Sequence, residues 1–170
     1  MDTVNHFFTK STALNARAEY ALGFLVCLWL MIAHWDALNF WLAIALFAYI
    51  DLIGTVPGLL AYHRSPDGQI ARTYYVLYDV MHSAVTQGLV MIAFTELFGF
   101  QWALLGIPTH LCVDRAMFNN YPKPFGLAFD PVLHPAFQRF RDDYAAFDAG
   151  AANWKAIKHA STTAVADRAV

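Results

Sequence analysis

The chain has 170 residues, of which 58% are hydrophobic and only 14% are charged. Soluble domains average about 25% charged residues, so this composition argues against a soluble globular domain. The net charge of −2 and the absence of a basic run argue against a nucleic-acid partner, and the two cysteines form neither a disulfide framework nor a zinc-binding motif.

Four long apolar stretches follow one another along the chain, and each is long enough to cross a bilayer as a helix. The turns at residues 36–38 and 99–100 are short, whereas the connection at residues 63–72 is longer and polar. The sequence therefore predicts an all-α fold, a four-helix transmembrane bundle made of two helical hairpins. The predicted spans are Arg17 to Trp35, Asn39 to Tyr62, Thr73 to Phe98 and Gln101 to Asn119.

The distribution of basic residues predicts the orientation of these spans. Cytoplasmic segments of membrane proteins carry an excess of Lys and Arg. All 11 Lys and Arg residues fall on one side of the membrane if the chain crosses it four times and both termini are cytoplasmic. A chain with three or five spans would break this pattern, so we predict that the N-terminus and the C-terminus both lie inside.

The residues after the fourth span differ in character from the spans. Phe137, Phe140, Tyr144 and Phe147 recur at helical spacing with charged residues between them, which is typical of an amphipathic helix. Such a helix can lie on the cytoplasmic membrane surface, cap the bundle or pack as an ordinary helix. The last ten residues have the composition of a disordered tail. The predicted regions are a cytoplasmic N-terminal segment (1–16), the bundle (17–119), and a cytoplasmic amphipathic helix with a flexible tail (120–170).

Five ionisable side chains lie inside the predicted spans. Such a side chain at mid-membrane costs at least ~2.5–3.5 kcal/mol, so it usually faces a partner or a cavity. A helix rises about 1.5 Å per residue, which places all five about 14 to 21 Å below the outer face. We therefore expect them to meet in one layer and to form a pocket that faces the cytoplasm. These residues are Asp51, Asp79, His82, His110 and Asp114.

Three interpretations fit such a cluster. Neutral His and ionised Asp are good ligands for iron, manganese or zinc. Asp–His pairs also serve as general acid and base or as a proton relay, and they can be purely structural when they hydrogen-bond across helices. His63, at the cytoplasmic end of the second span, is a further candidate to reach the site. The predicted metal ligands are Asp51, His82, His110 and Asp114, and the predicted catalytic residues are Asp79, His82, His110 and Asp114.

Two motifs of the third and fourth spans resemble a known family. They are Tyr78-x3-His82-Ser83 and His110-x3-Asp114-Arg115. The small bacterial four-helix membrane proteins of the domain of unknown function 4260 family show similar elements and an aspartate in the preceding span, which Asp51 matches. The resemblance covers roughly residues 49–135 and departs after Arg115, and Asp79 stands where the family usually has Asn. It implies a four-helix fold in the bacterial inner (plasma) membrane, but no established activity.

We expect a metal-dependent membrane enzyme that acts on a hydrophobic or lipid-like substrate, with iron, manganese or zinc as its cofactor. Two other function classes stay open: a non-catalytic accessory subunit of a membrane protein complex, and a proton-coupled carrier. A carrier with four spans would need to dimerise. The expected partners are the lipid bilayer and either other membrane proteins or a second copy of the chain, without nucleic acid.

Overall fold

The computed structural model describes residues 10–150, and these residues form helices, turns and loops with no β-strand among them. The predicted all-α class is therefore confirmed. The predictions for residues 1–9 and for the last ten residues lie outside the described range. The helical elements are α1 (Lys10–Ala33), η1 (Trp35–Ala37), α2 (Phe40–Gly54), α3 (Val56–Arg64), α4 (Arg72–Met81), α5 (Ala84–Phe98), η2 (Trp102–Leu105), α6 (Gly106–Val113), η3 (Asp114–Phe118) and α7 (Pro135–Gly150).

Two helical segments are long and apolar enough to cross a membrane. The first is Ser11–Ala33, within α1, and the second is Phe40–Arg64, which comprises α2 and α3. Asn39 is the N-cap of the second segment, because its side chain accepts a hydrogen bond from the backbone N–H of Leu42 at 3.1 Å. These segments overlap the first two predicted spans, and each extends beyond its predicted span at the end predicted to be cytoplasmic.

The third predicted span is not one straight helix. Helices α4 and α5 together are long and apolar enough to cross a membrane, but they are bent by 58° at the break between them. The Ser83 side chain caps the start of α5, and the carbonyls freed at the break find partners within the protein. Gln87 donates to the Met81 carbonyl at 2.7 Å, and Arg115 donates to the His82 carbonyl at 3.1 Å. The structure thus has a third candidate span if this bent pair crosses as one unit.

The fourth predicted span is helical, but its helix type changes along its length. It consists of the 3-10 turn η2, the α-helix α6 and the π-helical turn η3, and none of these is long enough to count as a span by itself. Asn119 ends the helical run in a left-handed conformation, with φ 53°. Arg17 of α1 donates to the Ala116 carbonyl at 2.8 Å, which satisfies one of the free carbonyls there. Four membrane crossings therefore stay a prediction, whereas two or three are supported by length and composition.

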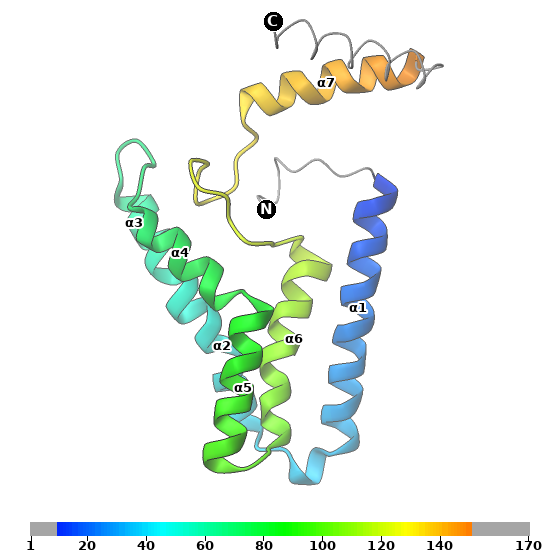
Figure 1. Ribbon diagram of the computed structural model, residues 1–170, viewed down its shortest axis with the longest axis vertical. Coiled ribbons are helices and arrows are strands. Elements are labelled where there is room, and N and C mark those ends of the chain that lie inside the picture. The colour runs from blue at the N-terminus through cyan, green and yellow to red at the C-terminus, as the bar shows by residue number, and fades with distance from the viewer. Residues whose placement is uncertain (1–9, 151–170) are drawn as a thin grey trace, which may run out of the picture. The chain divides into compact units, whose positions relative to one another are not determined.

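Within the unit that ends at Val132, helix α6 occupies a central position. It packs against α1, α2 and α5, and Figure 1 shows it between α1 and α5. Gly106 is the point of closest approach to α2, because a Cβ atom there would lie 2.4 Å from the carbonyl oxygen of Ala43. Small residues allow helix backbones to approach closely in this way. Ile50, Leu104 and Ile107 are almost fully buried and form part of the core at this junction.

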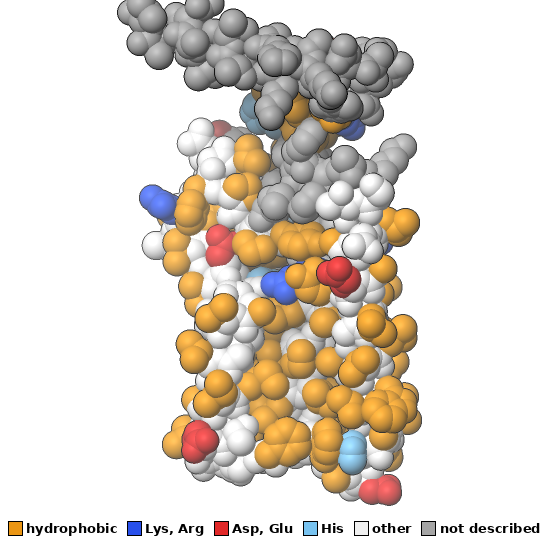
Figure 2. Space-filling model, turned by 45° about the vertical axis from the view of Figure 1, so that its right-hand side comes forward, with side chains coloured by type: hydrophobic (Ala, Val, Ile, Leu, Met, Phe, Trp, Pro, Cys, Tyr) orange, Lys and Arg blue, Asp and Glu red, His pale blue; other side chains and the backbone are white. Residues whose placement is uncertain are grey.

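The outer surface of this unit is strongly apolar. Figure 2 shows a band of hydrophobic side chains over one face, with charged side chains below and above the band. Trp29 of α1, Trp41 of α2 and Val85 of α5 are 65%, 77% and 75% exposed. Apolar patches of this extent mark contact with a membrane or with another protein. The surface therefore agrees with the candidate spans.

The second unit begins at Leu133 and contains α7. The predicted helix in this region is confirmed. The ring of Phe140 lies near those of Phe137 and Tyr144, with centroid distances of 6.4 and 6.1 Å, so these aromatic side chains share one face of the helix. Its location on the membrane surface stays a prediction.

Candidate metal centre

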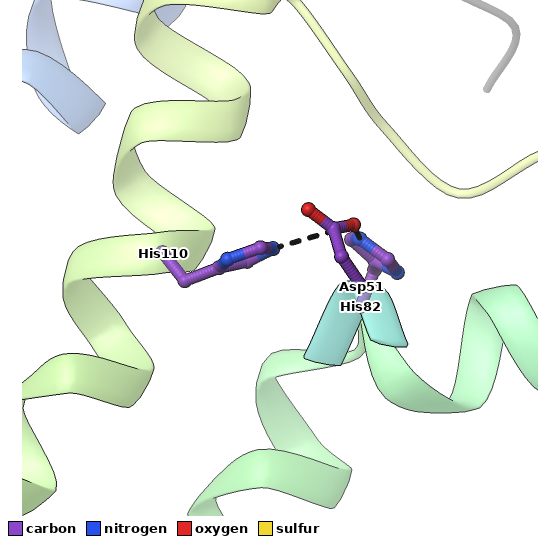
Figure 3. Close-up of side chains that lie close together, drawn as sticks. All are labelled: Asp51, His82 and His110. Atoms are coloured by element: carbon purple, nitrogen blue, oxygen red, sulfur yellow. Dashed lines mark hydrogen bonds and ion pairs between the residues drawn. The ribbon is translucent and has the colours of Figure 1, made fainter. Parts of the chain in front are cut away.

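Four polar side chains from α2, the α4–α5 break, α6 and η3 converge on one point. Asp51 lies one turn before the end of α2, His82 lies at the break after α4, His110 is in α6, and Asp114 is the first residue of η3. The Nε2 atom of His82 is 3.3 Å from Asp51 Oδ1 and 3.3 Å from Asp114 Oδ2. The Nε2 atom of His110 is 3.8 and 3.6 Å from the same two oxygens. Figure 3 shows His110 pointing from α6 toward Asp51 and His82.

Burial differs among these four side chains. His82 and His110 are 4% and 2% exposed and Asp114 is 12% exposed, whereas Asp51 is 46% exposed. The two imidazoles and Asp114 are thus shielded from the surroundings. The group is open on the side of Asp51.

The hydrogen bond of His82 determines which ring nitrogen carries the hydrogen. Its Nδ1 lies 2.9 Å from the backbone carbonyl oxygen of Tyr78. A carbonyl oxygen can only accept, so Nδ1 donates, and in a neutral ring Nε2 then presents its lone pair. This lone pair faces the carboxylates of Asp51 and Asp114. Such an arrangement needs a positive charge between the groups, either a proton on Nε2 or a metal ion.

The Nε2 atom of His110 is unusual because it is buried and, within the described part of the chain, makes no hydrogen bond. A buried polar atom left unsatisfied costs about 1–3 kcal/mol. The ring packs edge-on against Phe47, with centroids 4.8 Å apart, and its Nε2 faces the two carboxylates from beyond hydrogen-bonding distance. An ion shared with Asp51 and His82 would satisfy this nitrogen.

The arrangement fits a metal ion in both distance and charge. Asp51, His82 and His110 each offer a ligand atom, and these atoms lie within 4.8 Å of one another. Ligands bound about 2.0–2.2 Å from a tetrahedral ion are about 3.4 Å apart, close to the four N–O separations of 3.3–3.8 Å. Asp114 is not part of this three-residue group but lies beside it, and its carboxylate together with that of Asp51 carries −2, which a divalent ion cancels. This donor set suits iron, manganese or zinc.

Two neighbouring side chains orient the carboxylates. The Thr55 hydroxyl donates to Asp51 Oδ1 at 2.6 Å, and the Asn120 side-chain amide donates to Asp114 Oδ2 at 3.3 Å. Partners of this kind hold ligating groups in place. The sequence analysis missed both. Thr55 could have been found from its position one helical turn after Asp51, but Asn120 carries no such signal because it lies beyond the left-handed residue that ends η3.

The His82 ring packs between the Tyr78 ring and the backbone of α2 at Gly54. The Tyr78 ring is fully buried and stacks on it, with centroids 3.9 Å apart and planes at 13°. On α2, a Cβ atom at Gly54 would lie only 3.3 Å from the His82 ring and 2.8 Å from the Cβ of Met81. The glycine therefore gives the imidazole room against α2.

Asp79 and His63 occupy different places. The Asp79 carboxylate accepts a hydrogen bond of 2.6 Å from the backbone N–H of Lys123, so it secures the segment after η3. It is not part of the Asp51, His82 and His110 group that could hold a metal, and unlike Asp114 it forms no ion pair with the imidazoles of that group among the described residues. His63 is exposed near the end of α3, with its ring beside that of Tyr62. The structure thus brings together four of the five ionisable residues that the sequence singled out within the predicted spans.

The contact of Asp79 leads to a prediction that separates it from the site. An Asp79→Asn variant is expected to bind as much metal as the wild-type chain, because an amide oxygen can still accept the hydrogen bond from Lys123. The metal content per chain of the detergent-purified variant measures this. A loss of more than about half of the bound metal would mean that the charge of Asp79 belongs to the centre.

The residues themselves thus define a helical protein with candidate membrane spans and a buried Asp51, His82 and His110 group that could hold a metal ion. No model of a protein family, no curated protein and no solved structure matches this chain.

Proposed function

We propose that this chain is an integral membrane enzyme that binds one divalent transition-metal ion and acts on a hydrophobic or lipid-like substrate. The supporting observation is that two imidazole Nε2 atoms face the same two carboxylate oxygens at 3.3–3.8 Å. For His110 these distances are too long for hydrogen bonds, and its Nε2 atom makes no hydrogen bond with the described residues. One bound ion with Asp51, His82, His110 and Asp114 as ligands explains all four separations.

The exposure of Asp51 favours a catalytic role over a structural one. Structural metal sites are closed, whereas catalytic sites keep an open coordination position. Asp51 is about half exposed while the other three side chains are largely buried. A metal at such a site supplies Lewis-acid chemistry or, for iron and manganese, redox chemistry. The chain would hold the substrate at the open side and keep water from the buried side.

An apolar groove beside the centre supports a hydrophobic substrate. The groove, with a volume of about 240 Å³, lies between α1, α2 and α6. It begins at the turn around Trp35 and Phe40 and includes Phe47 and Thr109. Phe47 packs against the His110 ring, and Thr109 precedes His110 in the chain. A hydrocarbon chain in this groove would run toward the metal centre.

The proposal also includes the membrane topology of the chain and its relationship to a protein family. All 11 basic residues support four spans with both termini inside, and the aromatic face of α7 supports its placement on the cytoplasmic membrane surface. The family resemblance implies that the membrane is the bacterial inner membrane. The motifs around His82 and Asp114 support a relationship to the domain of unknown function 4260 family.

Metal analysis of the full-length protein tests the central claim. The protein is purified in detergent without chelators, incubated in turn with zinc, manganese and iron(II), and freed of unbound metal. We expect about one equivalent of at least one of these metals per chain. Less than about a tenth of an equivalent of each would overturn the proposal, and the Asp–His group would then be a metal-free relay or a structural contact.

A further inference from the structure

A second cavity lies away from the metal centre. It has a volume of about 610 Å³ and lies between the loop that joins α3 to α4 and the segment around residues 125–132. The metal ligands are not among its lining residues. The cavity carries one acidic and one basic side chain, Asp67 and Arg72, together with the aromatic rings of Tyr62, Tyr75 and Phe125.

One wall of the cavity is held firmly by Tyr75. This buried residue of α4 donates a hydrogen bond from its hydroxyl to the Leu127 carbonyl at 2.5 Å. Its ring also packs edge-on against Phe129 and Phe125, with centroid distances of 5.4 and 6.1 Å. These contacts fasten the segment around residues 125–129 to α4. The wall is therefore preformed rather than a chance gap between loops.

The opposite wall is built around Asp67 and Gly68. Gly68 has φ +71°, a conformation that glycine adopts without strain, and a Cβ atom there would lie 3.1 Å from the Tyr62 ring. The Ser65 hydroxyl and the Gln69 N–H both donate to Oδ1 of Asp67, at 2.8 and 3.1 Å. These two hydrogen bonds lower the pKa of Asp67 from its usual value, so its carboxylate is ionised at neutral pH. Its Oδ2 atom takes no part in either bond.

Arg72 supplies the opposite charge. Its guanidinium lies over the Phe125 ring, 4.2 Å from the centroid, which holds it at the edge of the cavity. Among the described residues, no ion pair joins Arg72 to Asp67. The cavity therefore offers a cation and an anion that do not neutralise each other directly, with aromatic rings beside them.

We propose that this cavity binds the headgroup of a zwitterionic phospholipid. Guanidinium groups bind phosphate strongly, so Arg72 would contact the phosphate. A carboxylate beside aromatic rings binds ammonium groups, so Asp67 with Tyr62 and Tyr75 would contact the amine end.

The location selects a lipid over a free headgroup. Helix α3 ends at Arg64 and α4 begins at Arg72, so the cavity lies where two candidate membrane segments end. Headgroups occupy this depth of the bilayer. The inference goes beyond the proposed enzyme and does not depend on the metal centre.

Binding measurements on the full-length protein in mild detergent test this site. Short-chain phosphatidylethanolamine, phosphatidylglycerol of the same chain length and free phosphoethanolamine are titrated separately, and binding is followed by native mass spectrometry. We expect phosphatidylethanolamine to bind at least about tenfold more tightly than either of the others. Equal binding of phosphatidylglycerol would overturn the role of Asp67, and equal binding of free phosphoethanolamine would overturn the assignment to a lipid.

Variants connect the binding to the cavity. Arg72→Gln and Asp67→Asn are each expected to weaken the binding of phosphatidylethanolamine at least about tenfold. Arg64→Gln is the matched control, because Arg64 is also exposed near this loop but does not line the cavity. The unfolding temperature of each variant verifies that it is folded. Wild-type affinity in both Arg72→Gln and Asp67→Asn, or an equal loss in Arg64→Gln, would overturn the proposal.

Discussion

The His110→Ala variant is expected to bind a divalent metal ion at least about 100-fold more weakly than the wild-type chain. Loss of an outer partner of a ligand already weakens metal binding about 10- to 100-fold, so loss of a ligand itself costs more. His110 is a suitable target because its Nε2 atom makes no hydrogen bond with the described residues. Removal of the imidazole therefore takes away little besides the metal contact and its packing on Phe47. Competition with a chelator of known affinity measures the effect.

Two further variants test whether a loss of metal binding is specific to the assigned ligands: Asp51→Asn alters a second ligand, and His63→Ala is the histidine control. Asp51→Asn keeps nearly the same shape and alters a half-exposed side chain, so it is expected to weaken metal binding without unfolding the protein. His63→Ala removes an exposed imidazole outside the group and is expected to bind metal as the wild type does. Wild-type affinity in both His110→Ala and Asp51→Asn would show that the assigned ligands are wrong.

A methyl group at Gly106 is expected to lower the free energy of unfolding by roughly 1–3 kcal/mol and to weaken metal binding as well. The added Cβ atom would lie 2.4 Å from the carbonyl oxygen of Ala43, and a backbone atom cannot rotate away as a side chain can. Helices α2 and α6 would have to separate. Because these helices carry Asp51 and His110, the ligand atoms would separate too.

Gly88→Ala is the matched control for Gly106→Ala. Gly88 lies inside α5, and a Cβ atom there would have no neighbour within 4 Å. Alanine also has the higher helix propensity, so this variant is expected to be as stable as the wild type or slightly more stable. Thermal unfolding and metal content, both measured in detergent, compare the two variants. If Gly106→Ala matches the wild type in both, the close packing of α2 on α6 does not control the metal centre.

The candidate spans could be predicted because they depend on local properties of the chain. The length of an apolar stretch determines whether it can cross a bilayer, and α1 and the α2–α3 segment follow that rule. The cost of a buried charge likewise singles out polar residues within such stretches, whatever their neighbours are. Asp51, His82, His110 and Asp114 could be found in this way.

The break between α4 and α5 could not be predicted, because no proline or glycine marks it within residues 73–87. The Ser83 side chain caps the start of α5. The carbonyl groups freed at the break need donors from elsewhere, and one of these donors, Arg115, lies far along the chain in η3. Inside a membrane a break is tolerated only where such partners exist. Whether they exist depends on packing, which local sequence does not reveal.

The different positions of Asp79 and Asp114 depend on the neighbours that each side chain meets. A spacing of three residues places two side chains near each other on a helix. His82 is the residue after α4, and its ring stacks on that of Tyr78, one helical turn earlier. It reaches Asp51 and Asp114, while Asp79 contacts Lys123.

Local composition and spacing thus identify the apolar helices and the polar residues that cannot face lipid, because both properties depend on each segment alone. The packing of α2 and α6, through Gly106, and the bend at His82 decide which of these residues meet. Convergence depends on the rotation and separation of helices, which contacts between distant segments determine.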